Sequence, residues 1–172
     1  MSKILLNVAI SLDGYLARIN GDVDYLGKMT EEGLKAFEPF IERVDSLVMG
    51  SATYDKIIEL GDFPYDDMEK YVLTTQEYGE ESKTLFTEMD IEELATLAKS
   101  KSEKNIWLMG GAKVVKQFID YDLIDEFIIT IVPMIIGTGI PLFLFSKEEV
   151  KLDLLSTNTS NGQVTLHYKR IK

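Results

Sequence analysis

Hydrophobic residues along the chain fall into short runs and into helical repeats, and the two patterns alternate. Short apolar runs bounded by glycine, proline or polar residues indicate buried β-strands. Between them, apolar residues recur at the three- and four-residue spacing that places them on one face of a helix. The predicted strands are residues 4–10, 46–49, 71–73, 85–86, 106–109 and 125–132, and the helical repeats are residues 34–44, 54–58, 91–98 and 114–119.

Polar and turn-forming residues predict where these elements begin and end. Thr30, Thr53 and Asp90 precede three of the helical repeats and are expected to be their N-caps. Pro39 lies inside the first repeat, so we expect a kink or a restart of that helix. Asn161-Gly162 separates two further apolar segments and is a strong signal for a β-hairpin turn.

The order of these elements predicts an α/β fold. As far as residue 132 the order is β-α-β-α-β-β-α-β-α-β, which is typical of a mostly parallel sheet with helices on both faces. A short strand at Leu142–Phe145 and hairpin strands at Lys151–Thr157 and Val164–Ile171 should then form an antiparallel C-terminal edge. No repeat, low-complexity tract or linker interrupts the chain, so we expect one domain that spans residues 1–172.

Composition and charge exclude several classes of site and partner. The net charge of −11 makes a nucleic-acid backbone or an anionic membrane surface an unfavourable partner. The chain has no cysteine, which excludes disulfides, thiolate metal sites and cysteine nucleophiles and is compatible with a reducing cytoplasm. His167 is the single histidine, so we expect it to be structural and expect no metal centre.

One segment resembles a membrane span in hydropathy alone. Residues 127–145 carry no charged side chain and would be long enough to cross a bilayer as a helix. Pro133, Gly137, Gly139 and Pro141 interrupt the segment, so two strands joined by a turn fit it better. The N-terminus offers no secretory signal, and we expect a cytoplasmic protein without a membrane partner.

Polar, glycine-rich turns follow four of the predicted strands, at residues 11–14, 50–53, 74–75 and 110–113. In parallel sheets, ligands bind outside the carboxyl ends of the strands. At Gly110-Gly111 a strand turns directly into a helix, and the helix's first N–H groups and positive dipole end suit a phosphate. The glycine pair alone fits an ordinary strand–turn–helix connection equally well. The recurrence at four strand ends favours an extended phosphorylated ligand such as a dinucleotide, although the G-x-G-x-x-G pattern is absent.

Motifs that occur in the same order resemble one known family. The chain is similar to the dihydrofolate-reductase-like superfamily, and within it to the reductase domain of the riboflavin-biosynthesis deaminase–reductase, the RibD C-terminal domain family, in its stand-alone bacterial form. The matching stretches are Ser11-Leu-Asp-Gly-Tyr-Leu-Ala17, Met49-Gly-Ser-Ala-Thr-Tyr54, Val72-Leu-Thr-Thr75, Trp107-Leu-Met-Gly-Gly-Ala112, and Asp125 to Pro133 with Gly137-Thr-Gly-Ile-Pro-Leu-Phe143. They span nearly the whole chain.

The resemblance implies an NADPH-dependent reductase. Ser51 stands where the family usually has an arginine, so a bidentate guanidinium clamp on the 2′-phosphate is missing. Lys113 and the Thr75 hydroxyl keep NADPH as the predicted cofactor. The cofactor-binding positions implied by the resemblance are Val8, Ala9, Leu16, Gly50, Ser51, Ala52, Thr53, Thr74, Thr75, Gly110, Gly111, Ala112, Lys113 and Val114.

The substrate side is less specific in the sequence. Hydride transfer needs an acceptor carbon held against the nicotinamide and a proton source for the adjoining atom. Asp24 resembles the acidic member of a family Asp-Trp pair and is the predicted proton donor, although Glu31, Glu32 and Glu38 lie in the same region. Asn7, Tyr54 and Thr130 are the predicted substrate contacts.

Three classes of function follow. The preferred one is a homodimeric reductase of a small pyrimidine- or pteridine-like substrate, resembling 5-amino-6-(5-phosphoribosylamino)uracil reductase, with dihydrofolate as a second candidate substrate. The second is a nucleotide-binding protein that kept the cofactor cleft without catalysis. The third is an interaction module built on the sheet, which would neither bind the cofactor nor turn over a substrate.

Overall fold

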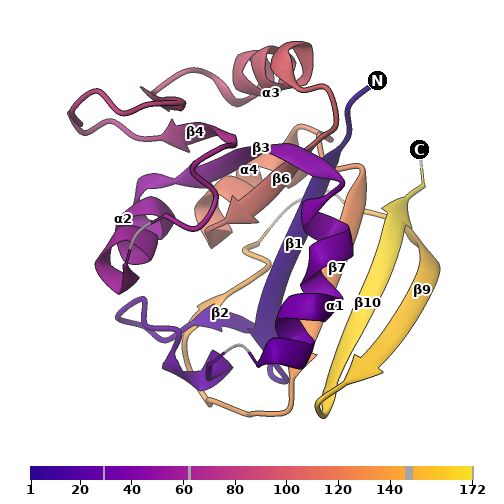
Figure 1. The fold of residues 1–172 in the computed structure, drawn as a ribbon. Coiled ribbons are helices and arrows are strands. Elements are labelled where there is room, and N and C mark those ends of the chain that lie inside the picture. The colour runs from indigo at the N-terminus through magenta and orange to yellow at the C-terminus, as the bar shows by residue number, and fades with distance from the viewer. Residues whose placement is uncertain (29, 62, 146–148, 172) are drawn as a thin grey trace.

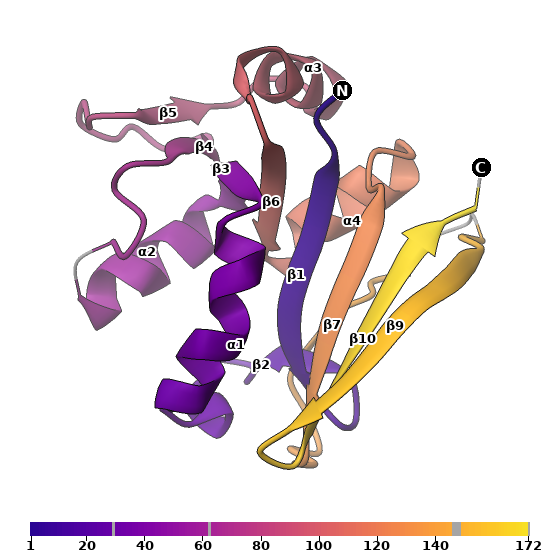
Figure 2. The same ribbon diagram turned by 45° about the vertical axis from the view of Figure 1, so that its right-hand side comes forward.

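The computed structural model describes residues 1–28, 30–61, 63–145 and 149–171 of the chain. Its centre is an eight-stranded sheet in the order β5-β4-β3-β6-β1-β7-β10-β9 (Figures 1 and 2). The strands from β5 to β7 in this order are parallel, and β10 and β9 form the antiparallel edge. The strands are β1 (Ile4–Ser11), β3 (Val44–Gly50), β4 (Glu69–Leu73), β5 (Thr84–Thr87), β6 (Asn105–Gly110), β7 (Glu126–Val132), β9 (Leu152–Ser160) and β10 (Gln163–Arg170). The predicted fold class is confirmed.

Helices cover both faces of the sheet, and alternate residues of the central strand β1 separate the two cores. Leu5 packs in one core with α1 (Glu31–Ile41) and α2 (Ser51–Leu60). Leu6 packs in the other core with α3 (Ile91–Lys101) and α4 (Ala112–Asp120). Figure 2 shows α1 in front of the sheet and α4 behind it. This two-sided cover explains why the parallel strands are apolar along their length.

A small second sheet and one turn of 3-10 helix complete the fold. The strands β2 (Tyr15–Ala17) and β8 (Ile140–Pro141) pair in antiparallel fashion beside the end of β1. The 3-10 helix η1 (Asp24–Leu26) follows β2. The apolar run at residues 127–145 is therefore interrupted and not one helix, as predicted, but its second strand is Ile140–Pro141 and not Leu142–Phe145. Within the described ranges, no helix is both long enough and apolar enough to cross a membrane.

The predicted start of the first helix is confirmed. The Thr30 side chain accepts a hydrogen bond from the Gly33 backbone N–H at 3.1 Å, so Thr30 caps α1 as predicted. The helix continues through Pro39 without a restart and ends at Ile41. Because Pro39 lies in the last turn, its missing N–H removes only one of the helix's final hydrogen bonds.

Three local predictions were wrong in detail. The second helix begins at Ser51 with Gly50 as its N-cap, so Thr53 lies in the first turn and does not cap it. Asp90 occupies the N-cap position of α3, but its side chain makes no capping hydrogen bond. Leu142–Phe145 is not a strand: Leu142 is buried alone, and Phe145 is 81% exposed. The strand in that region is β8, because its residues can pair with β2.

The strand register determines where the carboxyl ends of the strands lie. Met49 of β3 is level with Gly110 of β6, and Gly50 is level with Leu73 of β4. The glycine turns after β3 and β6 are therefore neighbours, with the end of β4 on one side. On the other side, β1 pairs with β6 only as far as Leu6, whereas it pairs with β7 up to Ser11. Beyond Leu6, the edge of β1 that faces β6 therefore pairs with no strand in the described part of the chain.

Candidate functional site

Two helices begin at these adjacent glycine turns with their N-termini free. Helix α2 has Gly50 as its N-cap and α4 has Gly111, and neither has a capping side chain or an acidic residue in its first turn. The other two helices differ, since both α1 and α3 carry acidic residues in their first turns. The first N–H groups of α2 and α4 thus lack the side-chain acceptors that normally satisfy them. With two positive dipole ends, the place suits an anion.

The two turns are in direct contact. A Cβ atom built on Gly50 would lie 3.0 Å from Val114 Cγ2, and one built on Gly111 would lie 3.5 Å from the Thr53 hydroxyl. Gly110 has a φ of +109°, which only glycine adopts readily. The start of α2 therefore lies against the start of α4, and glycine at position 50 allows this close approach. We refer to the residues Gly50–Thr53 and Gly110–Lys113 as the paired helix starts.

Most of the predicted cofactor-binding residues lie at or beside the paired helix starts. Thr74 and Thr75 follow β4, the neighbouring strand, and Lys113 is exposed in the first turn of α4. Three predicted residues are different, because Val8, Ala112 and Val114 are only 8%, 5% and 7% exposed. Their side chains are therefore closed to a ligand. Leu16, in β2, packs against the same core as Val8.

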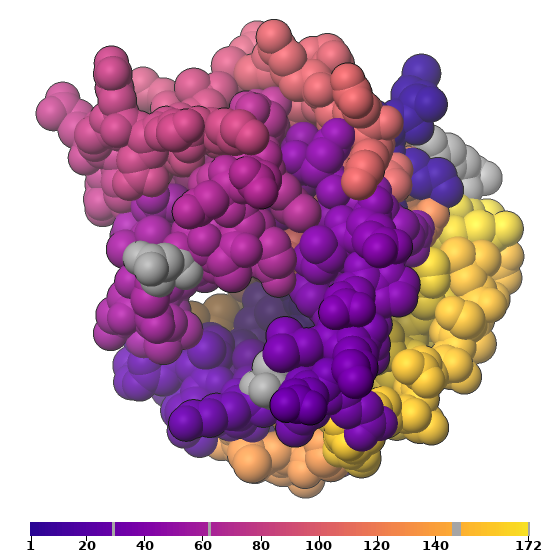
Figure 3. Space-filling view, in the orientation of Figure 1, coloured from indigo at the N-terminus to yellow at the C-terminus, as the bar shows by residue number. Residues whose placement is uncertain are grey.

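A hollow opens between the two halves of the molecule on the face covered by α1 and α2. Figure 3 shows it, with purple and magenta residues of the middle of the chain above and indigo residues of the N-terminal part below. The central strands of a covered sheet normally bury their side chains. Here Asn7, Ala9, Ile128 and Thr130, which face this side of β1 and β7, are only partly buried. We refer to these four positions as the cleft floor.

Two hydrogen bonds organise the cleft floor. The indole Nε1 of Trp107 donates to the backbone oxygen of Asn7 at 2.9 Å. The hydroxyls of Thr130 and Thr165 are 2.9 Å apart and share a hydrogen bond. The side-chain amide of Asn7 is half-buried on the same face, in the register position opposite Ile128. The predicted substrate contacts Asn7 and Thr130 are thus brought together on one face.

The third predicted substrate contact lies elsewhere. Tyr54 is 3% exposed, and its hydroxyl donates to the carboxylate of Glu81. Its ring contacts Phe63, Tyr78 and Phe86 beside β4 and β5. Burial, together with the Glu81 hydrogen bond, raises the pKa of the Tyr54 hydroxyl. Tyr54 is therefore a neutral member of an aromatic cluster at the β4–β5 side of α2.

Asp24, the predicted proton donor, lies in η1 with its side chain 63% exposed. Arg18 binds it in a bidentate manner, with Nε and the second guanidinium nitrogen 2.6 and 3.0 Å from the two carboxylate oxygens. The Arg18 hydrogen bond lowers the pKa of Asp24, so the carboxyl is ionised at neutral pH. A general acid needs the opposite shift. The proton-donor role of Asp24 thus stays a prediction without support from its surroundings.

Two polar clusters were not foreseen from the sequence. The first surrounds Asp13, which accepts hydrogen bonds from the Ser11 hydroxyl at 2.6 Å and from the backbone N–H groups of Gly137 and Ile136 at 2.8 and 3.2 Å. This cluster ties the turn after β1 to the loop before β8. The Ser11-Leu-Asp-Gly motif was the only signal for it, and its partner loop could not be named from sequence.

The second cluster surrounds Glu126, whose side chain is 6% exposed at the amino end of β7. Lys3, Arg43 and His167 contact its carboxylate at 2.7, 3.0 and 2.9 Å. His167 is thus part of a structural network, at the end of the sheet opposite the paired helix starts. Among the described residues, no three histidines, cysteines, aspartates or glutamates gather in a way that could hold a metal ion.

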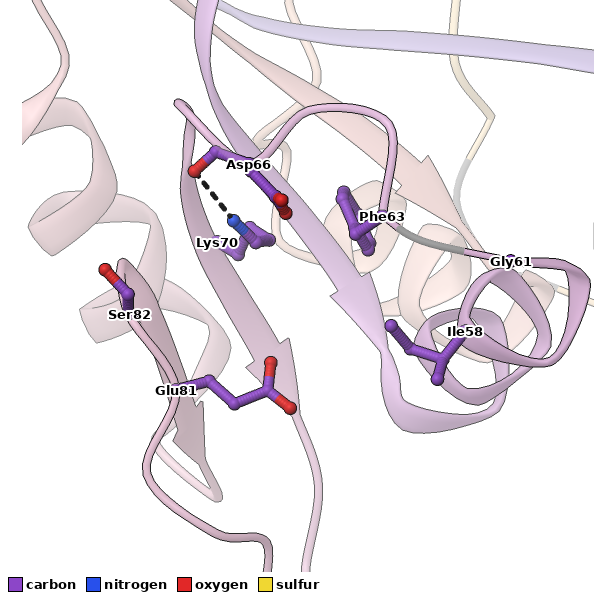
Figure 4. A pocket seen from close by; sticks show the side chains of 7 residues that line it. All are labelled: Ile58, Gly61, Phe63, Asp66, Lys70, Glu81 and Ser82. Atoms are coloured by element: carbon purple, nitrogen blue, oxygen red, sulfur yellow. Dashed lines mark hydrogen bonds between the residues drawn. The ribbon is translucent and has the colours of Figure 1, made fainter.

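A separate pocket of about 700 Å³ opens at the C-terminal end of α2 (Figure 4). Its cation, Lys70, is 4% exposed, donates to the backbone oxygens of Met68 and Asp66 at 3.2 and 3.3 Å, and lies over the ring of Phe63. The pocket's other charged groups are the carboxylates of Asp66 and Glu81. Because Lys70 is already engaged, this pocket suits an anionic ligand less well than the paired helix starts do.

Comparison with known proteins identifies the family. The RibD C-terminal domain family model matches residues 2–166. The Bacillus subtilis (strain 168) protein YwjB is 40% identical to the chain, and the alignment covers 98% of both. The structure of a Shewanella sp. PV-4 protein that is assigned provisionally to riboflavin biosynthesis superposes over the full length of both chains, with a TM-score of 0.86 and 27% identity.

Dihydrofolate reductase from Enterococcus faecalis, solved with NADP(H), has the same fold. Its TM-score is 0.70 over 99% of this chain and 97% of that one, at 17% identity, which shows a shared fold alone. The dihydrofolate-reductase-like architecture expected from the sequence motifs is confirmed. Matched by the family model over nearly its whole length, the chain belongs to the RibD C-terminal domain family.

Proposed function

We propose that the protein is a reductase that binds a nicotinamide dinucleotide across the carboxyl ends of its parallel strands. The observation that carries this proposal is the contact between the starts of α2 and α4, at Gly50 and Gly111. Two uncapped helix N-termini within contact of each other provide N–H groups for a diphosphate, without a competing carboxylate in either first turn. The predicted cofactor-binding residues at positions 50–53, 74–75 and 110–113 are part of this proposal.

The unpaired edge of β1 is a suitable position for the nicotinamide half of the dinucleotide. Alternation along β1 directs the Ala9 N–H and C=O to the β6 side, as it does the Lys3 carbonyl that accepts from Ile106. There the Ala9 groups can exchange hydrogen bonds with a flat amide, as a neighbouring strand would. The bound nicotinamide would supply the hydride. The chain's own contribution is to hold the acceptor molecule over the cleft floor and to exclude water from it.

The cleft floor also bears on the class of substrate. Its polar groups are the Asn7 amide and the Thr130 hydroxyl, which are neutral, and the neighbouring Trp107 ring packs edge-on with Phe37 and Phe40. Neutral donors and acceptors beside aromatic rings suit a small planar heterocycle such as a pyrimidine or pteridine. Dihydrofolate and a ribosylaminopyrimidine are therefore the first substrates to test.

The test uses Trp107 as an internal reporter. Trp107 is the only tryptophan and lies beside the cleft floor, on the same face of the sheet, so saturable quenching of its emission, or sensitised nicotinamide fluorescence, is expected on addition of NADH or NADPH. Oxidation of the bound nicotinamide in the presence of either candidate substrate would establish a reductase. Cofactor binding without turnover of a broad heterocycle set would instead favour the non-catalytic nucleotide-binding protein. Absence of binding by calorimetry would contradict both.

The predicted homodimer is part of the same proposal. The edge strand β9 is exposed from Asp153 to Thr159, and its outer edge is the open end of the sheet. Leu154 and Leu155 on it are 51% and 45% exposed. An open edge with apolar side chains can pair with a second copy. Sedimentation of the purified chain would decide between monomer and dimer.

A further inference from the structure

The proposed cofactor site is acidic at its β4 end. The Tyr78 hydroxyl donates to both carboxylate oxygens of Asp55, at 2.9 and 3.0 Å. The Tyr78 ring stacks on Phe86, with centroids 4.4 Å apart and planes 5° from parallel. Ser51 lies one helical turn before Asp55 on the same face of α2. Ser51 and the hydrogen-bonded pair Asp55 and Tyr78 therefore lie beside the start of α2, and we call these three residues the Asp55 triad.

No cation balances this group within the segments that form it. Residues 50–55 and 73–81 contain four carboxylates and neither lysine nor arginine. The carboxylates are Asp55, Glu77, Glu80 and Glu81. The lysine that follows, Lys56, is engaged with Asp22 at 2.8 Å and Glu59 at 3.0 Å.

The Asp55 triad lies on the side where the second half of a dinucleotide must lie. With the diphosphate at the paired helix starts, between the ends of β3 and β6, the reactive half extends towards the unpaired edge of β1. The other half then extends towards β4, the neighbour of β3 on the opposite side, about 5 Å away in the sheet. There it meets Ser51, Thr74 and the triad's carboxylate.

We propose, resting on the proposed function, that the Asp55 triad binds the hydroxyls of an unphosphorylated adenosine ribose and that the protein prefers NADH to NADPH. A carboxylate at this position accepts a hydrogen bond from a ribose 2′-hydroxyl, whereas a 2′-phosphate needs a cation in the same place. The bond from Tyr78 orients the Asp55 carboxylate while leaving acceptor lone pairs on both oxygens. Juxtaposing a 2′-phosphate with these carboxylates is repulsive.

Lys113 is the residue on which an NADPH preference would depend. It is exposed in the first turn of α4, on the other helix of the pair, next to the proposed diphosphate position. A diphosphate is common to both cofactors, so Lys113 does not discriminate between them. Position 51, which could have supplied the discriminating cation, carries the neutral side chain of Ser51.

Calorimetric titration of the full chain with NADH and with NADPH tests the proposal. We expect NADH to bind at least about tenfold more tightly, and more so at low salt, where the repulsion is unscreened. Ser51→Arg should raise the affinity for NADPH about tenfold. The preference for NADH over NADPH should then become smaller or reverse. Asp55→Asn should weaken the binding of NADH and strengthen the binding of NADPH. It serves as the second variant if Ser51→Arg does not fold.

Lys113→Ala is the matched control, since it should lower the affinity for NADH and the affinity for NADPH by a similar factor. The proposal is overturned if NADPH binds as tightly as NADH or more tightly, or if Lys113→Ala weakens NADPH alone. Binding of neither cofactor is a different result, because it would overturn the proposed function itself.

Discussion

A side chain on Gly50 would press on Val114: a Cβ atom there lies 3.0 Å from Val114 Cγ2, closer than ordinary contact. Gly50 has a φ of −86°, so its backbone tolerates alanine and the contact alone decides the outcome. We expect Gly50→Ala to push α2 and α4 apart, to lower the free energy of unfolding by about 1–3 kcal/mol and to weaken cofactor binding. Chemical denaturation and cofactor titration measure the two effects.

Val114→Ala in the same background provides the control for this prediction. Truncating Val114 removes the atom that the added methyl group at position 50 would meet, so the double variant should regain cofactor affinity relative to Gly50→Ala. Simple additivity of the two losses would show that the Gly50–Val114 approach does not matter for binding.

The Glu126 network predicts a stability change at acid pH. Burial alone would raise the pKa of Glu126, but hydrogen bonds from Lys3, His167 and Arg43 outweigh it and lower the pKa to about 2. Since the folded pKa lies below the ordinary value of 4.5, the stabilisation is complete above pH 4.5 and is lost as the pH falls towards 2. It amounts to about 3–4 kcal/mol, because the pKa falls from 4.5 to about 2 and each pKa unit corresponds to about 1.4 kcal/mol.

Thermal unfolding as a function of pH measures this effect. Glu126→Gln should destabilise the protein near neutrality and flatten the fall between pH 4.5 and 2. Asp153→Asn is the matched control, because Asp153 and Lys169 are 54% and 52% exposed and such pairs contribute less than about 1 kcal/mol. An equally steep fall in Glu126→Gln would assign the acid sensitivity to other carboxylates.

Asp24 and Arg18 offer a direct test of the predicted proton donor. Because Arg18 lowers the pKa of Asp24, we expect Asp24→Asn to reduce turnover by less than about tenfold once a substrate is known. Loss of a true general acid reduces turnover by roughly 10²- to 10⁴-fold and removes the corresponding limb of the pH–rate profile. Arg18→Gln removes the hydrogen bond from Arg18 and should therefore raise the pKa of Asp24. A matching shift in the pH–rate profile would show that Asp24 does donate the proton.

The α1 cap gives a prediction about stability alone. Thr30 accepts from the Gly33 N–H at 3.1 Å, so Thr30→Ala should lower the free energy of unfolding by about 1 kcal/mol. Thr96→Ala is the matched control, since the Thr96 hydroxyl only bonds back to the Glu92 carbonyl within α3, and its removal should cost less than about 0.5 kcal/mol. Equal losses in urea denaturation would mean that the Thr30 cap adds nothing.

The sequence predicts the elements whose signals are local. The apolar run at Ile4–Ile10, the Thr30 cap and the Asn161-Gly162 turn all correspond to observed features, because each depends on neighbouring residues. The prediction failed at Leu142–Phe145, where only Leu142 is buried and the apolar run does not pair. The prediction of Thr53 as a cap also failed, because helical periodicity does not distinguish a cap from a first-turn residue.

The site depends on contacts that no local signal carries. The glycine turns at residues 50 and 110 could each be recognised, but their contact follows from the strand order, in which β6 inserts between β3 and β1. Asp13 and Gly137, like Tyr78 and Asp55, are brought together by the fold across long stretches of chain. For these pairs, the residue types can be read from the sequence, but their proximity is known only from the fold.

Backbone amide NMR shifts during an NADH titration test most directly the proposal that a dinucleotide's diphosphate binds at the starts of α2 and α4. We expect saturable shifts concentrated at residues 51–53 and 112–114, with little change at the starts of α1 and α3, where acidic residues occupy the first turn. Saturable shifts centred instead on the pocket around Ile58 and Lys70, or no shifts at millimolar cofactor, would contradict it.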